Sequence, residues 1–190
     1  MKKKYIMIDG KGIEKYMKLH FETPRLRVYD ATEEEIPKII DMENSEENRN
    51  FVFQGSYEEH LAEIKSEDKL LLSIKEKNSG EMVGFSLSVI NNKANSFEFR
   101  RIVIDKKGLG YGKEFIEGLL RYCFISLNMN RFWLDVFEDN IVGIKLYTNF
   151  GFVHEGTLRQ SCKGENGYRN QLIFSMLRDE YLKKYGNKEK

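Results

Sequence analysis

Three glycines alternate with other residues in the stretch Lys107-Gly108-Leu109-Gly110-Tyr111-Gly112-Lys113. The stretch directly follows an apolar, strand-like run over 99–104 and directly precedes a helix-like pattern. Glycine lets the backbone approach a ligand closely, and the N–H groups and dipole at a helix start favour a negative charge. The spacing therefore indicates a site for a phosphorylated molecule, although the same glycines could form a tight turn that binds no ligand.

Two nucleotide-binding motifs do not fit this stretch. A Walker-type loop has four residues between its first glycine and its Gly-Lys-Ser/Thr end, so the segment between Gly108 and Gly112 is one residue too short. Glu114 also replaces the hydroxyl residue that would hold magnesium. The dinucleotide motif Gly-x-Gly-x-x-Gly has its last glycine one position later and stands near the start of a βαβ unit. More than half of this chain precedes the glycines, which disfavours a dinucleotide site.

A second pair of residues with useful chemistry is Asn140 and Tyr147, an amide and a phenol seven positions apart. Seven positions are about two helical turns, so both side chains share one helix face with Ile144. Asn140 also suits the N-cap of this helix, and Gly151 suits the position just after its end. The alternative interpretation of Tyr147 is a half-buried core tyrosine.

The elements that must position these residues follow from the hydrophobic pattern. Apolar alternation and short apolar runs predict strands over 26–29, 70–74, 82–90, 96–104, 132–136, 152–153 and 172–176. Capping signals and apolar residues three or four positions apart predict helices over 32–43, 57–64, 115–127 and 140–149. The order predicts a mixed α/β fold with one strand–helix–strand crossover around the glycine loop.

Length and composition predict one ordinary domain. The chain has 190 residues, of which 41% are hydrophobic and 32% are charged, enough for a sizeable core. We expect an N-terminal extension over 1–20 and a single domain over 21–190. Cys123 falls in an apolar helical stripe and Cys162 in a polar loop, so a disulfide framework is not expected. The low cysteine content predicts a protein of the reducing cytoplasm, and no run suits a signal peptide or a membrane span.

Charge is distributed unevenly along the chain. Residues 30–68 contain thirteen acidic and three basic residues, a net charge of −10, so the remainder of a chain with net charge +1 carries +11. Acidic helices are usually solvated faces. The alternative is a basic site for an anionic cofactor and an acidic approach for a cationic acceptor.

Taken together, the motifs resemble the GNAT superfamily of acetyl-coenzyme A-dependent N-acetyltransferases over residues 80–182. The segment 107–112 is similar to the family's Arg/Gln-x-x-Gly-x-Gly/Ala pyrophosphate loop. The segment 140–152 resembles its Asn-x-x-Ala-x-x-Leu-Tyr…Gly-Phe motif. The chain departs from the family at Lys107, where arginine or glutamine is common, and at Gly143, which replaces alanine. That glycine should weaken its helix by roughly 0.8–1 kcal/mol.

The resemblance implies a central twisted sheet flanked by helices, with acetyl-coenzyme A at the strand–glycine loop–helix site. By resemblance, Tyr147 is the general acid that protonates the departing sulfur. Glu98 is our candidate for the group that accepts the amine proton, with an exposed strand residue as the alternative. The expected cofactor-binding residues are Ile102, Val103, Ile104, Lys107, Gly108, Leu109, Gly110, Tyr111, Gly112, Lys113 and Asn140. No metal is expected, and the three histidines, His20, His60 and His154, lack ligand spacing and are interpreted as incidental.

The sequence says less about the identity of the acceptor amine than about the acetyl donor. Within the superfamily, the chain from Leu127 to Leu182 looks most like the spermidine/spermine acetyltransferases and the enzymes that acetylate the N-termini of ribosomal proteins. The acidic first half favours a polyamine, and it would also suit a basic protein tail. A non-catalytic acyl-coenzyme A sensor stays open, as does a homodimer. Nucleic-acid binding is disfavoured, because the lysines over 2–4 and 183–190 lack a recognition motif.

Overall fold

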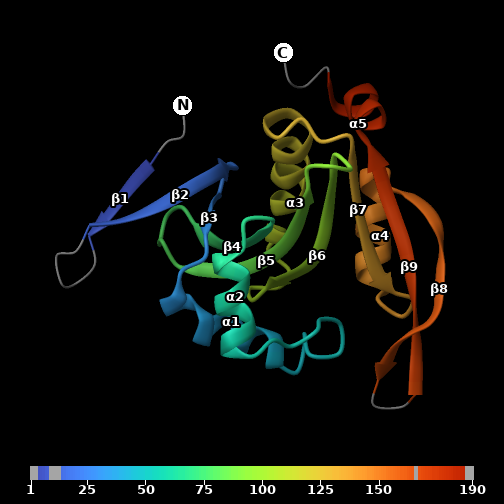
Figure 1. Ribbon diagram of the computed structural model, residues 1–190, viewed down its shortest axis with the longest axis horizontal. Coiled ribbons are helices and arrows are strands. Elements are labelled where there is room, and N and C mark those ends of the chain that lie inside the picture. The colour runs from blue at the N-terminus through green and yellow to red at the C-terminus, as the bar shows by residue number, and fades with distance from the viewer. Residues whose placement is uncertain (1–3, 9–13, 165–166, 187–190) are drawn as a thin grey trace. The chain divides into compact units, whose positions relative to one another are not determined.

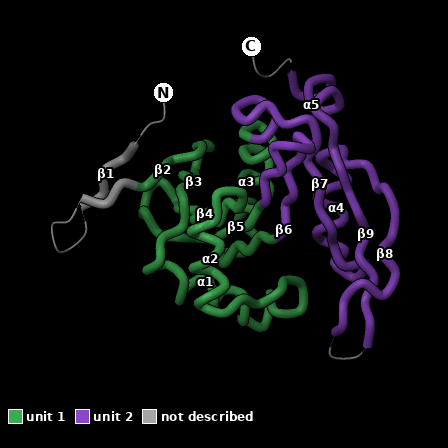
Figure 2. Tube along the Cα trace, in the orientation of Figure 1, with its two compact units in different colours: residues 1–88, 101–122 green, residues 89–100, 123–190 purple. Residues whose placement is uncertain are grey.

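The computed structural model describes residues 4–8, 14–164 and 167–186 (Figure 1). The chain divides into two compact units, which we describe separately (Figure 2). The first unit comprises residues 1–88 and 101–122, and the second comprises residues 89–100 and 123–190. The boundary crosses two strands, so each unit contains part of β5 and part of β6.

The strands of the first unit follow one another in the order β1-β2-β3-β4-β5-β6. Their bounds are β1 (Lys4–Ile8), β2 (Glu14–Glu22), β3 (Leu26–Asp30), β4 (Lys69–Glu76), β5 (Met82–Asn91) and β6 (Ser96–Ile104). The pairs from β1 to β4 are antiparallel. Residues 82–88 of β5 are all buried, as expected for a strand that lies between two others and is covered on both faces.

Helices of the first unit supply the rest of its core. A 3₁₀ turn (Glu33–Glu35) leads into α1 (Ile36–Asn44), and α2 (Tyr57–Lys65) and α3 (Tyr111–Arg121) follow. One cluster of buried apolar side chains joins α1 to the strands, and it includes Ile39, Met42, Leu71, Phe85, Leu87 and Val103. The apolar stripe of α1 therefore packs against the sheet as its spacing predicts.

The second unit contains the strand order β6-β7-β9-β8. Its elements are the π-helical turn Tyr122–Ser126, β7 (Arg131–Phe137), α4 (Ile141–Phe150), β8 (Val153–Gly164), β9 (Gly167–Leu177) and α5 (Arg178–Tyr185). β6 and β7 are parallel over 96–98 and 131–133, whereas β7 and β8 are each antiparallel to β9. Aromatic rings packed against one another form much of this core, and Phe132 lies at its centre with Phe97, Phe99, Phe124 and Phe152 around it.

The mixed α/β prediction is confirmed, two local expectations are wrong, and three elements were not predicted. The expected strand over 152–153 is the start of the much longer β8, so Cys162 lies on a strand rather than in a loop. The first half of the chain also carries the strands β1 and β2, which the sequence pattern did not predict. Helix α5 was missed as well. The extension over 1–20 and the domain over 21–190 stay predictions, and residues 1–3, 9–13, 165–166 and 187–190 of those ranges lie outside the described residues.

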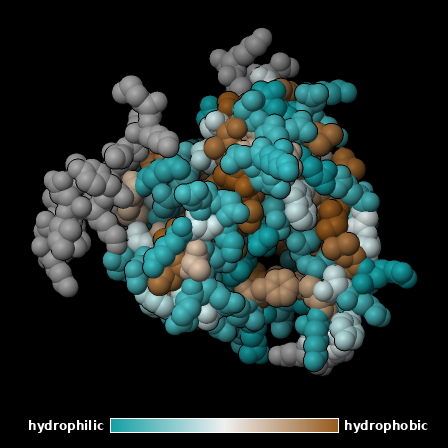
Figure 3. All heavy atoms as spheres, viewed as in Figure 1, coloured by the Kyte–Doolittle hydropathy of each residue, from teal (hydrophilic) through white to brown (hydrophobic). Residues whose placement is uncertain are grey.

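Within the described part of the chain, no helix is both long and apolar enough to cross a membrane. Hydrophilic side chains cover most of the face drawn in Figure 3, and apolar side chains appear there in smaller groups.

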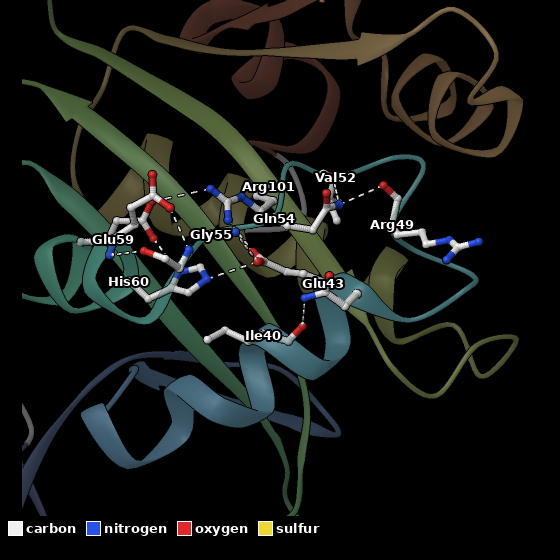
Figure 4. Close-up of polar contacts among 12 residues, drawn as sticks. Ile40, Glu43, Arg49, Val52, Gln54, Gly55, Glu59, His60 and Arg101 are labelled. Carbon is white, nitrogen blue, oxygen red and sulfur yellow. Dashed lines mark hydrogen bonds and ion pairs between the residues drawn. The ribbon is translucent and has the colours of Figure 1, made fainter. Parts of the chain in front are cut away.

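A buried network of charges holds α1, α2 and β6 of the first unit together (Figure 4). Glu43 of α1 is fully buried. One of its carboxylate oxygens forms an ion pair with Arg101 of β6. The other oxygen accepts from the backbone N–H of Gly55 at 2.8 Å and lies 3.2 Å from Nε2 of His60. Through these contacts Glu43 joins α1 to β6, to α2 and, at Gly55, to the segment between α1 and α2.

His60 of α2 is the proton-carrying member of this network. Its Nδ1 lies 2.9 Å from Glu63, so both ring nitrogens face carboxylates, and only the protonated ring can donate to both. Burial by itself lowers the pKa of His60, but the hydrogen bonds to Glu43 and Glu63 outweigh it and raise that pKa to about 9. A Cβ on Gly55 would lie 2.7 Å from Nε2 of His60, so the ring and Gly55 fit only without a side chain there. His60 therefore has a structural role in this network, which its sequence context did not predict.

The network predicts that stability falls in mildly alkaline solution. Below pH 6.5 the ring is protonated in the folded and the unfolded chain, and the stabilisation is complete. As pH rises from 6.5 through about 9, the unfolded chain loses this proton first, so the free energy of unfolding should fall by about 3 kcal/mol. Urea unfolding between pH 6 and pH 10 measures the effect. The His60→Gln variant should lose this pH dependence, whereas the exposed His154→Gln should keep it. Equal slopes for wild type and His60→Gln would contradict the assignment.

Candidate functional site

The glycine loop lies between β6 and α3 in the first unit (Figure 1). Gly108 and Gly110 have φ angles of +76° and +77°, which L-residues with side chains adopt only at a cost. Gly110 is the N-cap of α3 and contributes no side-chain hydrogen bond to the first turn. The loop is exposed, with Leu109 52% accessible. A sharp turn, an uncapped first turn and solvent access together make a site suited to an anion.

The end of β6 leads into this loop. Val103 and Ile104, two of the three residues that we expect beside the thioester, are buried, and Ile102 is half-buried. The neighbouring strand β5 approaches very closely, because a Cβ on Gly84 would lie 2.4 Å from the carbonyl oxygen of Val103. Gly84 therefore sets the distance between the two backbones at this point.

Lys107 makes a contact that its sequence motif did not predict. Its ammonium donates to Oδ1 of Asn48 at 2.6 Å. Asn48 is buried, and its amide nitrogen donates to the carbonyl of Met42 and to Ser45. Partial desolvation lowers the pKa of Lys107, although Glu47 and Asp105 act in the opposite direction. Lys107 thus ties the glycine loop to the segment after α1, and its contact with phosphate stays a prediction.

Tyr147 and Asn140 both belong to α4 in the second unit. Tyr147 is buried, and its ring packs edge-on against Phe152 at 5.7 Å between centroids. Asn140 is the N-cap, and its Oδ1 accepts from the backbone N–H of Gly143 at 2.9 Å. A Cβ on Gly143 would come within 3.1 Å of the Asn140 amide. The glycine that replaces the family's alanine therefore leaves room for this cap.

Burial raises the pKa of the Tyr147 phenol, and the charge of Asp135 raises it further. The phenol therefore remains protonated at neutral pH and is available as a proton donor. Tyr147 is a core residue, as the alternative interpretation held. That position does not remove the chemistry of its hydroxyl group, because a buried phenol can still donate.

Glu98 and Asp135 bring two carboxylates into the same unit. Glu98 of β6 pairs in register with Trp133 of β7. Both of its oxygens accept from the guanidinium of Arg100, from Nε at 2.8 Å and from Nη2 at 3.3 Å. Glu98 is half-buried, so the exposed-strand alternative describes it only in part.

Asp135 of β7 is a residue that sequence reasoning missed. Burial raises the pKa of its carboxyl group, and the nearby charge of Glu98 adds to the shift. The amide of Gln171 on β9 donates to it. The Gln171 oxygen in turn accepts from Ser161 at 2.8 Å and from Cys162 at 2.9 Å on β8. The sequence held one signal for Asp135: it is an acidic residue between the alternating apolar residues Leu134 and Val136, so it lies on the opposite face of the strand.

The site residues described above all lie within the part of the chain that matches a known protein family. A model of the acetyltransferase (GNAT) domain matches residues 30–173. A probable spermine N(1)-acetyltransferase of Bacillus subtilis subsp. natto is 33% identical over 87 residues, 42% of this chain and 57% of that protein. A spermidine N(1)-acetyltransferase of Vibrio cholerae is 28% identical over 127 residues, 66% of this chain and 72% of that protein.

A solved structure shares the fold. The spermidine N-acetyltransferase SpeG of Vibrio cholerae, in a mutant form, superposes with a TM-score of 0.74 at 23% identity, over 84% of this chain and 98% of that one. The chain spans about half the length of several curated relatives it matches, from 42% to 57%. Because the family model covers more than two thirds of the residues, the match is not limited to one motif. The chain belongs to the GNAT family of acetyltransferases.

Proposed function

We propose that this protein transfers an acetyl group from acetyl-coenzyme A to a primary amine, with a polyamine as the preferred acceptor. The observation that carries the proposal is the left-handed backbone at Gly108 and Gly110 in front of an uncapped α3. Such a turn suits a pyrophosphate, because the amide N–H groups and the helix dipole face the anion. Membership of the GNAT family supports the same donor.

The acceptor assignment rests on charge and on the relatives. The exposed acidic residues between β3 and β4 are Glu33, Glu34, Asp41, Glu46, Glu47, Glu58, Glu59, Glu67 and Asp68. An acidic surface of this kind attracts a polycation and accelerates its encounter with the protein. Two similar proteins are named as a spermine and a spermidine acetyltransferase. A basic protein N-terminus would fit the same surface and is the second candidate.

The reaction requires a neutral amine. A free alkyl amine has a pKa of about 10.4, so at pH 7 its deprotonation costs about 4.6 kcal/mol. In the proposed mechanism Glu98 accepts this proton, directly or through water. Asp135 is a second carboxylate in the same unit, and its raised pKa makes it a stronger base than an ordinary aspartate.

The departing thiolate requires a proton. In the proposed mechanism Tyr147 donates it, since its raised pKa keeps the phenol protonated throughout the neutral range. An alkyl thiol has a pKa of about 8.5, so transfer of the phenol proton to the thiolate is uphill. The proton transfer can therefore assist the reaction only if it occurs while the carbon–sulfur bond breaks, as in general acid catalysis. Asn140 is proposed to contact the pantetheine arm through its amide nitrogen, because its oxygen already caps α4.

Acetyl transfer to polyamines should be measurable directly. We expect saturable thiol release from acetyl-coenzyme A with spermidine or spermine, and weaker release with amino sugars and with basic N-terminal peptides. Added salt should raise the KM for the polyamine, because salt screens the acidic surface. Faster thiol release with the basic peptides than with the polyamines would identify a basic protein N-terminus as the preferred acceptor. Binding of acetyl-coenzyme A without release for any amine would overturn the transferase proposal and favour a sensor.

If Tyr147 is the general acid, removal of its hydroxyl group should lower kcat without changing the binding of acetyl-coenzyme A. Tyr147→Phe should lower kcat by about 10²-fold or more, while the KM for acetyl-coenzyme A changes only slightly. The matched control is Tyr181→Phe, because Tyr181 is a buried tyrosine of the same unit on α5. Tyr181→Phe should leave kcat near the wild-type value. An unchanged kcat in Tyr147→Phe would exclude the acid assignment.

The two carboxylates make different predictions for the pH profile. Glu98→Gln should lower kcat/KM at pH 7 by about 10²-fold, and the deficit should shrink as pH approaches the amine pKa, where solvent supplies the neutral amine. Asp135→Asn should lack this alkaline recovery. Steady-state rates between pH 6 and pH 10 decide the matter. Recovery in Asp135→Asn alone would move the base role from Glu98 to Asp135.

A further inference from the structure

Arg25 lies in the turn between β2 and β3 and contacts the glycine loop from a distant part of the sequence. Hydrogen bonds within the turn fix its backbone, from Thr23 N–H to the Leu26 carbonyl and from Leu26 N–H to the Thr23 hydroxyl, each at 3.0 Å. The Arg25 carbonyl accepts from the Lys77 N–H at 2.8 Å. The side chain therefore projects from a rigid base.

The guanidinium of Arg25 contacts three consecutive parts of the loop–helix junction. Its Nη1 donates to the carbonyl of Leu109 at 2.9 Å. Its central carbon lies 4.6 Å from the centre of the Tyr111 ring, within range of a cation–π interaction. A Cβ on Gly110 would lie 3.5 Å from Nη2, so the positive charge is directly beside the left-handed glycine.

Glu114 places a negative charge beside the Arg25 guanidinium at the start of α3. It lies in the first turn of α3, where a carboxylate competes with any bound anion for the same positive helix end. Its Oε2 accepts from Arg25 Nε at 2.6 Å, and its Oε1 accepts from the Thr23 hydroxyl at 2.6 Å and from the Arg25 N–H at 2.7 Å. Partial burial raises the pKa of Glu114, but these hydrogen bonds outweigh it and hold that pKa below its usual value. Glu114 is thus ionised, and Arg25 neutralises it.

We propose that Arg25 is a positioning residue for the anionic cofactor. It holds the Leu109 carbonyl, and with it the loop backbone, in the turn that presents the α3 N–H groups. It also directs the Glu114 charge away from those groups. This role rests on the proposed acetyl-coenzyme A function. It implies that the effect of Arg25 on the affinity for acetyl-coenzyme A depends on the charge of Glu114.

A double-mutant cycle tests the coupling. Calorimetry with coenzyme A, together with kcat and KM for acetyl-coenzyme A, is measured for wild type, Arg25→Met, Glu114→Gln and the double variant. Arg25→Met should weaken binding at least tenfold, with kcat at saturation within about twofold of wild type. Glu114→Gln should change affinity by less than threefold. The double variant should bind more tightly than Arg25→Met, because the uncompensated charge is gone.

Two further variants separate positioning from general stability. Arg27→Met is the matched control, because Arg27 is 45% exposed against 48% for Arg25 and also pairs with a glutamate, Glu22 at 2.8 Å. It should leave the affinity unchanged. Arg25→Lys keeps the charge but not the planar fork, so it should lose the Leu109 contact and weaken binding part of the way towards Arg25→Met. It also provides the measurement if Arg25→Met does not fold.

The outcomes for the two proposals are distinct. Wild-type affinity in Arg25→Met, or equal affinity in Arg25→Met and the double variant, would overturn the role of Arg25 and leave the acetyltransferase proposal standing. Failure of the wild-type protein to bind coenzyme A would overturn the proposed function itself.

Discussion

The left-handed backbone at Gly108 and Gly110 is the constraint on which the proposed cofactor site depends. It ends β6 and starts α3 within a few residues, and the N-cap residue Gly110 has no side chain that could cap the first turn. A side chain at either glycine would add strain at a positive φ. The proposed anion binding would therefore depend on the backbone. In the same proposal, Arg25 keeps that backbone in place and pairs with the Glu114 carboxylate, so that this carboxylate does not offset the positive helix end.

Carboxylates that are buried or half-buried have two different kinds of partner in this chain. In the first unit, Glu43 and Glu63 face a protonated His60 and Arg101, so two negative charges meet two positive ones. Burying charge is costly unless it is paired and hydrogen-bonded, and this network meets both conditions. In the second unit, Asp135 receives a neutral amide from Gln171, and its pKa is raised. A balanced network suits a structural role, whereas a carboxylate with a raised pKa suits proton transfer.

Strong local periodicity explains what could be predicted. The bounds of β6 agree with the expected 96–104, because its apolar residues form a clear strand-like run. The bounds of α2 and α4 differ from expectation by only one residue, because each helix begins at a capping residue. β8 was nearly missed because most of its residues are exposed and show no apolar alternation. α5 is short and rich in charge, and its anchor is a single buried tyrosine, Tyr181. Cys162 was assigned to a loop for the same reason as β8.

The sequence by itself determined the glycine turn, the short helix with Asn140 as its N-cap and Gly151 after its end, and the family, because these depend on spacing within a few turns of chain. Tertiary structure alone decided which charges that are distant in the sequence are paired. Arg25 meets Glu114 across 89 positions, and Arg101 meets Glu43 across 58. Such pairs form where strands and helices become neighbours in space, and the local pattern of residues carries no record of those neighbours. Whether a glutamate is a solvated surface charge or a member of a buried network is therefore a property of the fold.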